Sequence, residues 1–423
     1  MRALTDLASL RRAGTPRGIT SVCSAHPLVL RAALRHARRT GETVLIEATC
    51  NQVNHRGGYT GMTPADFAAL VAAIADEEGC PRDAVLLGGD HLGPNPWRDR
   101  PAAEAMAEAE AMIAAYVAAG FAKIHLDASM GCAGEPAALD DAATAARAVR
   151  LAAVAERAAQ AAGGAMPVYV IGTEVPPPGG ADHALAAIAP TSRQAARRTI
   201  DVHRAVFGEA GLAAAFERVI GLVVQPGVEF GNHNVIRYDR PAARDLCGLL
   251  GETDGLVFEA HSTDYQGEAP LAELVADGFA ILKVGPELTF MLREALYGLD
   301  LVASDLVPDY GARPLHDTME RVMTARPGDW ARHYHGDEAE RRWLRHYSLS
   351  DRIRYYWAAP EAEAAVARLF AALSGARVPM PLLRQHLPAA LAFADSPLDP
   401  ADVVIAHVTA SLETYRRAGR PGG

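Results

Sequence analysis

Lysine is almost absent from this chain of 423 residues, and arginine supplies nearly all of its positive charge. Only Lys123 and Lys283 occur. Because arginine cannot replace a compact or titratable ammonium group, each surviving lysine is a candidate functional residue. We expect Lys123, at the start of a strand, to pack only its aliphatic stem. We expect Lys283, at the end of a strand, to bind phosphate, with an ion pair to nearby carboxylates as the alternative.

Cysteine and long apolar runs are scarce too. The cysteines are Cys23, Cys50, Cys80, Cys132 and Cys247. They have no regular spacing and form no Cys-x-x-Cys pair, which favours a reducing cytosol and argues against a thiolate zinc site. No apolar run reaches about 18 residues, and the N-terminal stretch lacks the apolar core of a signal peptide. We therefore expect a cytoplasmic protein without a membrane span.

Nucleotide-binding motifs are missing as well. No Gly-x-Gly-x-x-Gly follows an expected strand, and no Gly-x-x-x-x-Gly-Lys-[Ser/Thr] or Gly-x-Ser-x-Gly occurs. These absences disfavour nicotinamide-dependent oxidation and nucleotide-dependent phosphoryl transfer, so we expect no nucleotide cofactor. The formal net charge of −10 on a surface of mixed sign argues against a nucleic-acid partner.

Eight short apolar runs, each ending in polar or ionisable residues, are the strongest positive feature. They span residues 19–26, 44–49, 84–91, 123–129, 168–174, 218–225, 256–262 and 280–286. Their Val, Ile and Leu show no alternation, which is typical of parallel strands covered on both faces. Segments of helical character lie between them, so the sequence predicts a (β/α)8 TIM barrel. An open doubly wound sheet is the alternative, but it normally has five or six strands.

Domain and helix boundaries follow from the same pattern. We expect residues 1–305 to form the barrel and residues 306–423 to form a helical C-terminal extension that packs on it, since a typical barrel has roughly 250 residues. Capping residues predict helix starts at Thr63 and at Thr191 or Ser192, and helix ends near Gly120 and Gly163.

The strand ends place ionisable residues on one rim of the predicted barrel, the rim where such barrels carry out catalysis. These residues are His26, Glu47, Asp90, His91, Asp127, Glu174, Gln225, Glu259, His261 and Lys283. Asp90 and His91 form the sharpest motif, GGDHLGPN, whose two leading glycines would let the backbone approach a ligand closely. The alternative is that Asp90 caps a helix while His91 packs against a loop.

Carboxylates and imidazoles that converge on a barrel axis need a compensating cation. We expect a divalent metal, zinc before manganese or magnesium, bound by His91 and His261, with Glu174 as a ligand or directly behind one. His125 is expected to point away if Asp127 points towards the site. A metal-free polar network around a sugar is the alternative.

Two further segments suit substrate recognition. Glu47, Asn51, Gln52 and Asn54 follow the second strand, and their amides suit a hydroxyl-rich ligand, unless the segment is only a capped surface loop. Gln225 follows the sixth strand. Arg352 and Arg354 lie in SLSDRIRYYW, which is either a phosphate clamp or an arginine-rich helix packed by aromatic rings.

Several long motifs carry a family resemblance. They are SVCSAHPLV (21–29), the segment 45–67 with NQVN and GGYTGMTPADF, LGGDHLGPN (87–95), KIHLDASM (123–130), VIGTEVP (170–176), VVQPGVEF (223–230), EAHSTDYQ (259–266) and YSLSDRIRYYW (347–357). In them the chain resembles the class II tagatose-bisphosphate aldolase Z-subunit family, often called the non-catalytic subunit. The resemblance implies a class II aldolase-like barrel and cytosolic metabolism of tagatose-related sugars.

The resemblance leaves two functions open. One is a metal-dependent 4-epimerase that interconverts fructose and tagatose, or their 6-phosphates. The other is a stabilising subunit of a class II tagatose-1,6-bisphosphate aldolase in galactitol, N-acetylgalactosamine or tagatose metabolism, with a catalytic aldolase subunit as partner. We favour the epimerase, because a scaffold does not need a rim dense in ionisable groups. We also expect a homo-oligomer.

Retro-aldol chemistry assigns roles to these residues. We expect Asp90 to be the acid/base at O4, and Asp127 and Glu259 to bind hydroxyl groups or act as a second base. Substrate-binding residues would be Glu47, Asn51, Gln52, Asn54, Gln225, Lys283 and Arg352, the last two at a 6-phosphate. A class I aldolase with a Schiff base on Lys283 is the remaining alternative.

Overall fold

Eight parallel strands close into a barrel in the computed structural model, which describes residues 1–172 and 188–421. The strands are β1 (Ile19–Cys23), β2 (Val44–Thr49), β3 (Val85–Leu92), β4 (Lys123–Leu126), β5 (Val168–Ile171), β6 (Val219–Val223), β9 (Val257–Ala260) and β10 (Phe279–Val284). Each predicted run overlaps one strand, and the strands follow one another around the barrel in the order β1-β10-β9-β6-β5-β4-β3-β2. The TIM-barrel prediction is confirmed. A hairpin of β7 (Glu229–Phe230) and β8 (Val235–Ile236) follows β6.

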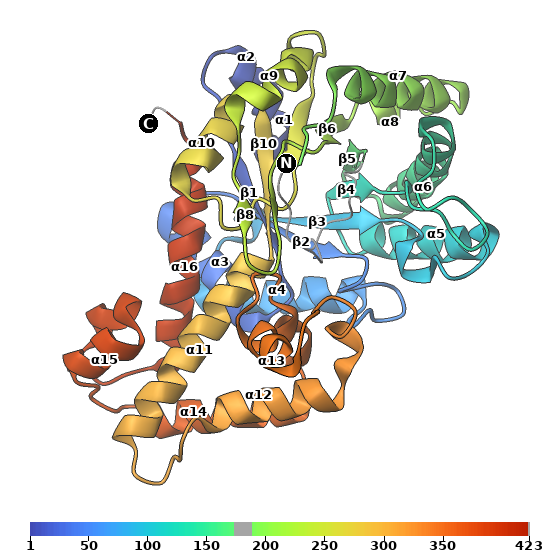
Figure 1. Cartoon of the computed structure of the whole chain (residues 1–423). Coiled ribbons are helices and arrows are strands. Elements are labelled where there is room, and N and C mark those ends of the chain that lie inside the picture. Colours follow the sequence, from blue (N-terminus) through green and yellow to red (C-terminus); the bar gives the residue numbers. More distant parts are fainter. Residues whose placement is uncertain (173–187, 422–423) are drawn as a thin grey trace.

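Helices surround the barrel (Figure 1). Those before β10 are α1 (Arg2–Thr5), α2 (Leu7–Arg12), α3 (Pro27–Thr40), α4 (Pro64–Glu78), α5 (Ala102–Ala118), α6 (Asp141–Ala162), α7 (Arg193–Glu209), α8 (Ala213–Phe216), α9 (Arg240–Gly248) and α10 (Glu268–Ala276). Those after it are α11 (Pro286–Leu306), α12 (Pro314–Ala325), α13 (Glu338–Tyr347), α14 (Pro360–Leu373), α15 (Met380–His386) and α16 (Pro400–Ala418). None of the helices within the described ranges is both apolar enough and long enough to cross a bilayer.

Local sequence signals explain where several helices begin and end. Thr63 and Asp66 form a reciprocal capping box at the start of α4, and Ser192 caps α7 by accepting the N–H of Ala195. Gly163 ends α6 in the left-handed conformation, which a glycine adopts without a steric penalty. These boundaries match those expected from the sequence.

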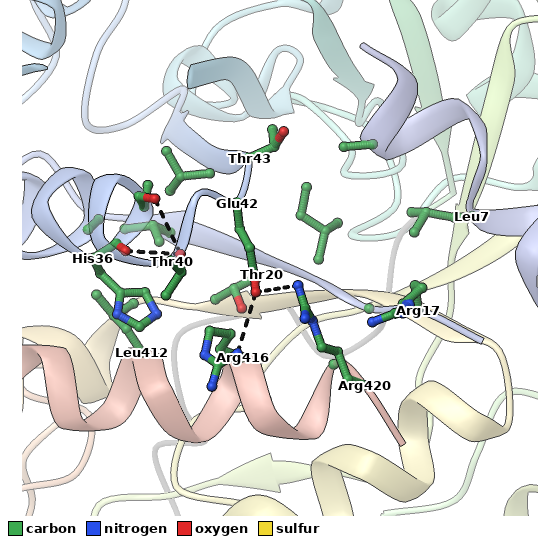
Figure 2. A pocket seen from close by; sticks show the side chains of 18 of the residues that line it. Leu7, Arg17, Thr20, His36, Thr40, Glu42, Thr43, Leu412, Arg416 and Arg420 are labelled. Carbon is green, nitrogen blue, oxygen red and sulfur yellow. Dashed lines mark hydrogen bonds and ion pairs between the residues drawn. The ribbon is translucent and has the colours of Figure 1, made fainter. Parts of the chain in front are cut away.

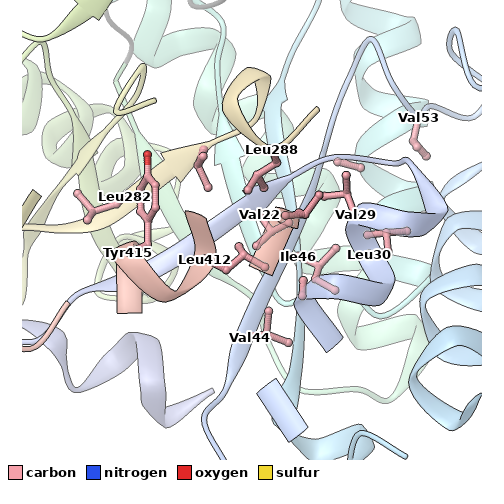
Figure 3. Packing of buried hydrophobic residues seen from close by; sticks show 14 of the residues in the cluster. Val22, Val29, Leu30, Val44, Ile46, Val53, Leu282, Leu288, Leu412 and Tyr415 are labelled. Carbon is pink, nitrogen blue, oxygen red and sulfur yellow. The ribbon is translucent and has the colours of Figure 1, made fainter. Parts of the chain in front are cut away.

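The last helix, α16, joins the ring of helices and packs against α3, α10 and α11. Figure 3 shows Leu412 and Tyr415 of α16 beside Val22 of β1 and Leu282 of β10. The Tyr415 hydroxyl donates to the carbonyl oxygen of Thr263 at 2.8 Å, directly after β9. The C-terminal helix therefore supports the loop that follows the seventh barrel strand.

An apolar cluster, separate from the packing around α16, fills the N-terminal half of the barrel. It contains Leu45, Val170 and Ile281 from the strands, and Leu4 of α1 and Leu7 of α2 pack against them. Packing of this kind leaves no channel through the barrel. Polar groups are instead concentrated towards the C-terminal end of the strands.

Candidate active site

Asp90, His91, His125 and His261 meet at the C-terminal end of the barrel. One ligand atom of each lies within 4.8 Å of the others. They come from β3, β4 and the loop after β9, and all are buried or nearly so. Asp90, His91 and His261 also line a cavity that is open to solvent. The barrel thus brings together three imidazoles and a carboxylate from distant parts of the sequence.

An irregularity in β3 lets two consecutive residues face this cluster. Gly89 pairs with Ile124 and Leu92 pairs with Leu126, so β3 contains one residue more than β4 across this stretch. His91 lies in the extra stretch with a φ of 49°, a strained conformation for a non-glycine residue. Side chains alternate in a regular strand, and a bulge removes that restriction. Asp90 and His91 can therefore both contact the centre.

The glycines before Asp90 make room for protein side chains. A Cβ atom on Gly88 would lie 2.3 Å from Oε1 of Glu47, and one on Gly89 would lie 2.4 Å from a methyl of Leu92 and 2.9 Å from the Tyr116 ring. The expectation that they admit a ligand is wrong, because these side chains already fill the space.

Each imidazole of the cluster has a second hydrogen-bonding partner. The pairs are His91 Nδ1 with Asp127 Oδ2 (2.7 Å), His125 Nε2 with Gly172 O (2.9 Å) and His261 Nε2 with Glu259 Oε1 (3.0 Å). Histidines that bind metals almost always donate their other ring N–H to a carboxylate or carbonyl in this way. The other nitrogens of His91 and His125 are turned towards Asp90, at 3.8 Å and 3.1 Å.

The donors of the cluster fit a divalent cation. His125 Nε2 must carry its proton, because its partner is a carbonyl oxygen, so Nδ1 is an acceptor and receives the N–H of His91 at 3.2 Å. That acceptor lies only 3.1 Å from Oδ1 of Asp90. Two facing lone pairs repel each other unless a cation or a proton compensates them. The nitrogen-rich set suits zinc best among the predicted metals.

The interpretation that His125 points away from the site is wrong. Lys123, His125 and Asp127 lie two residues apart, and all three side chains interact with residues of the lumen or its rim. Residues at that spacing share one face of a strand. The same spacing in the sequence could have placed His125 in the cluster.

A layer of alternating charges lies beside the cluster. The ammonium group of Lys123 is 2.6 Å from Glu47 and 2.7 Å from Glu259, and all three side chains are fully buried. Lys283 contacts Glu47 and lies 2.7 Å from Asp90. Lys123 therefore does more than pack its stem, since its whole length faces the lumen. Lys283 forms the ion pairs considered as the alternative, and it also lines the cavity.

These contacts fix the charge states of the centre. Burial alone would raise the pKa of Asp90, but His91 and Lys283 hold it well below its usual range. Burial would lower the pKa of Lys283, but carboxylates led by Asp90 raise it well above the ordinary value. A protonated lysine is not a Schiff-base nucleophile, which disfavours the class I alternative. Burial lowers the pKa of His261 to about 4 despite Glu259, so this imidazole is neutral, as a metal ligand must be.

The residues expected to bind substrate fall into two groups. Asn51 and Gln52 line the cavity. Asn54 does not, and its Oδ1 accepts the backbone N–H of Gly58 at 3.1 Å, which shapes the loop after β2. Gln225 likewise lies away from the cavity, with its Oε1 accepting two N–H groups of its own loop.

Three other predicted residues lie away from the cavity or cannot be placed. Glu47 lies beneath it, in the buried charge layer. Arg352 does not line it and donates to the carbonyl oxygen of Asp329 at 2.8 Å, whereas Arg354, two residues later, does line it. Glu174 lies outside the described residues.

The GatZ/KbaZ-like family of D-tagatose-1,6-bisphosphate aldolase subunits matches residues 4–420. The chain belongs to this family. It is 61% identical over 419 residues, 99% of both chains, to a protein of Agrobacterium fabrum (strain C58 / ATCC 33970) named D-tagatose 6-phosphate 4-epimerase. The predicted family membership is confirmed.

A solved structure in the family supports the fold. The chain is 57% identical to a probable tagatose 6 phosphate kinase from Sinorhizobium meliloti 1021, with a TM-score of 0.88. The match covers 95% of this chain and 100% of the other. The two relatives thus carry names for different chemistries, and the residues of the site must distinguish between them.

Proposed function

We propose that this protein is a 4-epimerase that interconverts D-tagatose 6-phosphate and D-fructose 6-phosphate. The observation that carries the proposal is the cluster of Asp90 with three imidazoles. Asp90, His91 and His261 line the same cavity as Asn51 and Gln52. The 61% identity to the Agrobacterium 4-epimerase supports the same substrate. Amide groups can donate to and accept from sugar hydroxyls, which suits a ketose.

His91, His125 and His261 would hold a divalent cation, most favourably zinc. Such a cation would supply Lewis-acid stabilisation of the negative charge that develops on the sugar oxygens. Asp127 and Glu259 fix the orientation of His91 and His261 from behind. Glu174 remains the predicted carboxylate near this centre.

Inversion at C4 needs bond cleavage. The C4 hydrogen is β to the C2 carbonyl, which does not acidify it. Asp90 takes the proton of O4, the C3–C4 bond breaks, and C4 becomes an aldehyde. The bonding electrons form an enediolate across C2 and C3 of the other fragment. The aldehyde turns its other face, the C3–C4 bond forms again, and Asp90 returns the proton to O4. Lys283 keeps Asp90 ionised between turnovers.

The test is an incubation of the purified protein alone with D-fructose 6-phosphate in D2O, after EDTA treatment and addition of zinc, manganese or magnesium. NMR should detect D-tagatose 6-phosphate only when metal is present, and without deuterium at C4. Deuterium at C4 would refute the cleavage mechanism. No turnover with any metal would refute the epimerase.

An accessory role is the second candidate, because the family description calls its members aldolase subunits. In that case the protein alone would be inactive and would raise the melting temperature of a catalytic class II aldolase subunit. Kinase activity has less support, because the chain lacks the phosphate-binding loop motif. Since the incubation contains no nucleoside triphosphate, epimerisation in it could not arise from a kinase.

A further inference from the structure

A 6-phosphate substrate needs a cation in the cavity, and neither lysine is available for it. Lys283 lines the cavity, but its ammonium group contacts Glu47 and lies 2.7 Å from Asp90. Lys123 is fully buried between Glu47 and Glu259. Buried carboxylates already neutralise both ammonium groups, and they would repel a phosphate placed beside either lysine.

The usual phosphate position of such barrels is also filled. In many of them the loops after the seventh and eighth strands bind phosphate with backbone N–H groups. Here Oδ1 of Asp264, after β9, accepts the N–H groups of Gly285 at 3.0 Å and Glu287 at 2.8 Å, at the start of α11. Asp264 also lines the cavity. A phosphate would therefore meet a carboxylate there.

Arg354 is a cavity residue whose positive charge is still available for a phosphate. It belongs to the 3₁₀ turn Arg352–Tyr356 and lines the cavity. Its Nη1 donates to the carbonyl oxygens of Ser350 and Asp351, the latter at 3.1 Å, and its Nη2 donates to the Tyr355 hydroxyl at 2.9 Å. Carbonyl and hydroxyl oxygens orient a guanidinium without cancelling its charge. The carboxylate of the neighbouring Asp351 pairs with Arg293 instead, at 3.0 Å, and Arg354 forms no ion pair with a carboxylate in the described part of the chain.

The surroundings of Arg354 suit one end of a small substrate. Tyr59, from the loop after β2, packs edge-on against Tyr355 at 4.9 Å and lines the same cavity. Arg354 also borders a second cavity, which shares Cys23, Gln52 and Tyr59 with the first. Residues 173–187 contain neither lysine nor arginine. That segment therefore cannot supply a competing ammonium or guanidinium group.

We propose that Arg354 is the residue that binds the 6-phosphate and so selects a phosphorylated over a free ketohexose. The inference rests on the proposed function, and it replaces Arg352 with Arg354 as the phosphate ligand. Arginine presents a planar fork of donors that matches phosphate oxygens, which makes this residue type well suited to the task.

The experiment compares Arg354→Met, Arg354→Lys and Arg352→Met with the metal-loaded wild type, using D-fructose 6-phosphate and free D-fructose. Arg354→Met should raise KM for the phosphorylated sugar about 10- to 100-fold. KM for free fructose and kcat for both sugars should change little. Arg354→Lys should recover part of the loss, because it keeps the charge. Equal effects on both sugars, or a selective loss in Arg352→Met instead, would overturn the proposal.

A binding measurement separates this inference from the epimerase proposal. Calorimetry with inorganic phosphate and metal-free protein should show binding to wild type, weakened about 10-fold or more in Arg354→Met. Arg377→Gln is the matched control, since Arg377 is exposed and its side chain donates to the carbonyl oxygen of Asp395. Equal phosphate affinity in wild type and Arg354→Met would refute the role of Arg354, even if the enzyme proved to be an epimerase. Selective binding without turnover would support Arg354 while refuting the epimerase.

Discussion

Both ends of the barrel contain a cavity, but the charged residues of one are partly exposed and those of the other are buried. At the N-terminal end, shown in Figure 2, Glu42 forms ion pairs with Arg416, at 3.4 Å, and with Arg420. These side chains are all partly exposed. At the C-terminal end, the carboxylate of Asp90 and three imidazoles lie close together and are buried.

The difference shows how to distinguish a functional cavity from a structural one. Partly exposed pairs are solvated and already neutralised, so they need no ligand and contribute little free energy. Buried acceptors that face each other are costly unless a cation or substrate compensates them, and such costs are concentrated at functional sites. The chemistry therefore belongs to the C-terminal end.

Replacement of Asp90 with Asn should have the largest effect on activity at that end. The amide cannot accept the O4 proton, so kcat should fall about 10²- to 10⁴-fold. The zinc content should remain near that of wild type, because the three imidazoles are unchanged. Steady-state kinetics and elemental analysis check both results. Retention of full epimerase activity would remove Asp90 as the base.

Replacement of Lys123 with Met tests the charge layer under the cluster. It removes the ammonium group that lies within 2.7 Å of both Glu47 and Glu259 and leaves Lys283 as their remaining lysine partner, so the free energy of unfolding should fall by about 3–5 kcal/mol. Urea denaturation measures this change. The double variant Lys123→Met/Glu259→Gln should recover part of the loss. If it is no more stable than the single variant, uncompensated charge is not the cause.

Replacement of Asp127 with Asn tests the support behind the cluster. Asp127 holds His91 Nδ1 at 2.7 Å, so metal affinity should fall about 10- to 100-fold while the fold persists. Competition with a chelator measures the affinity. Ser129→Ala is the control, since Ser129 donates to the other oxygen of Asp127 at 3.0 Å, and its effect should be smaller. Equal effects of the two changes would contradict a direct role through His91.

Replacement of Glu42 with Ala provides the contrasting case at the N-terminal end. It removes one ion-pair partner from each of two partly exposed arginines, and Arg416 keeps its pair with Glu413, so stability should change by less than about 1 kcal/mol. The epimerase kcat should be unaffected. Thermal unfolding and kinetics check this outcome, and a loss of activity comparable to that of Asp127→Asn would show that the two ends are functionally coupled.

The sequence predicted the barrel well, because both faces of its strands are buried and their apolar runs are uninterrupted. Asp90, His91 and His261 were also predictable, since they directly follow such runs. The position of His125 was not predicted, although its spacing from Lys123 and Asp127 contained the information. The β3 bulge had no sequence signal that we recognised, because it arises from pairing with β4.

Which loop side chains line the cavity was harder to predict. Asn54 and Gln225 suit sugar hydroxyls by residue type, yet backbone groups of their own loops use their carbonyl oxygens. Arg352 and Arg354 are the same residue type within one short segment, so the sequence does not distinguish them. Only the 3₁₀ turn decides that Arg354 lines the cavity.

The sequence by itself determined the strand order along the chain, the rim that carries the ionisable groups and the family. Periodicity and residue type are local properties, so they can be read without coordinates. Tertiary structure alone decided which of those groups contact one another, that both lysines are held by carboxylates, and that Asp264 fills the usual phosphate position. These outcomes depend on distances between residues far apart in the chain, which closure of the barrel sets.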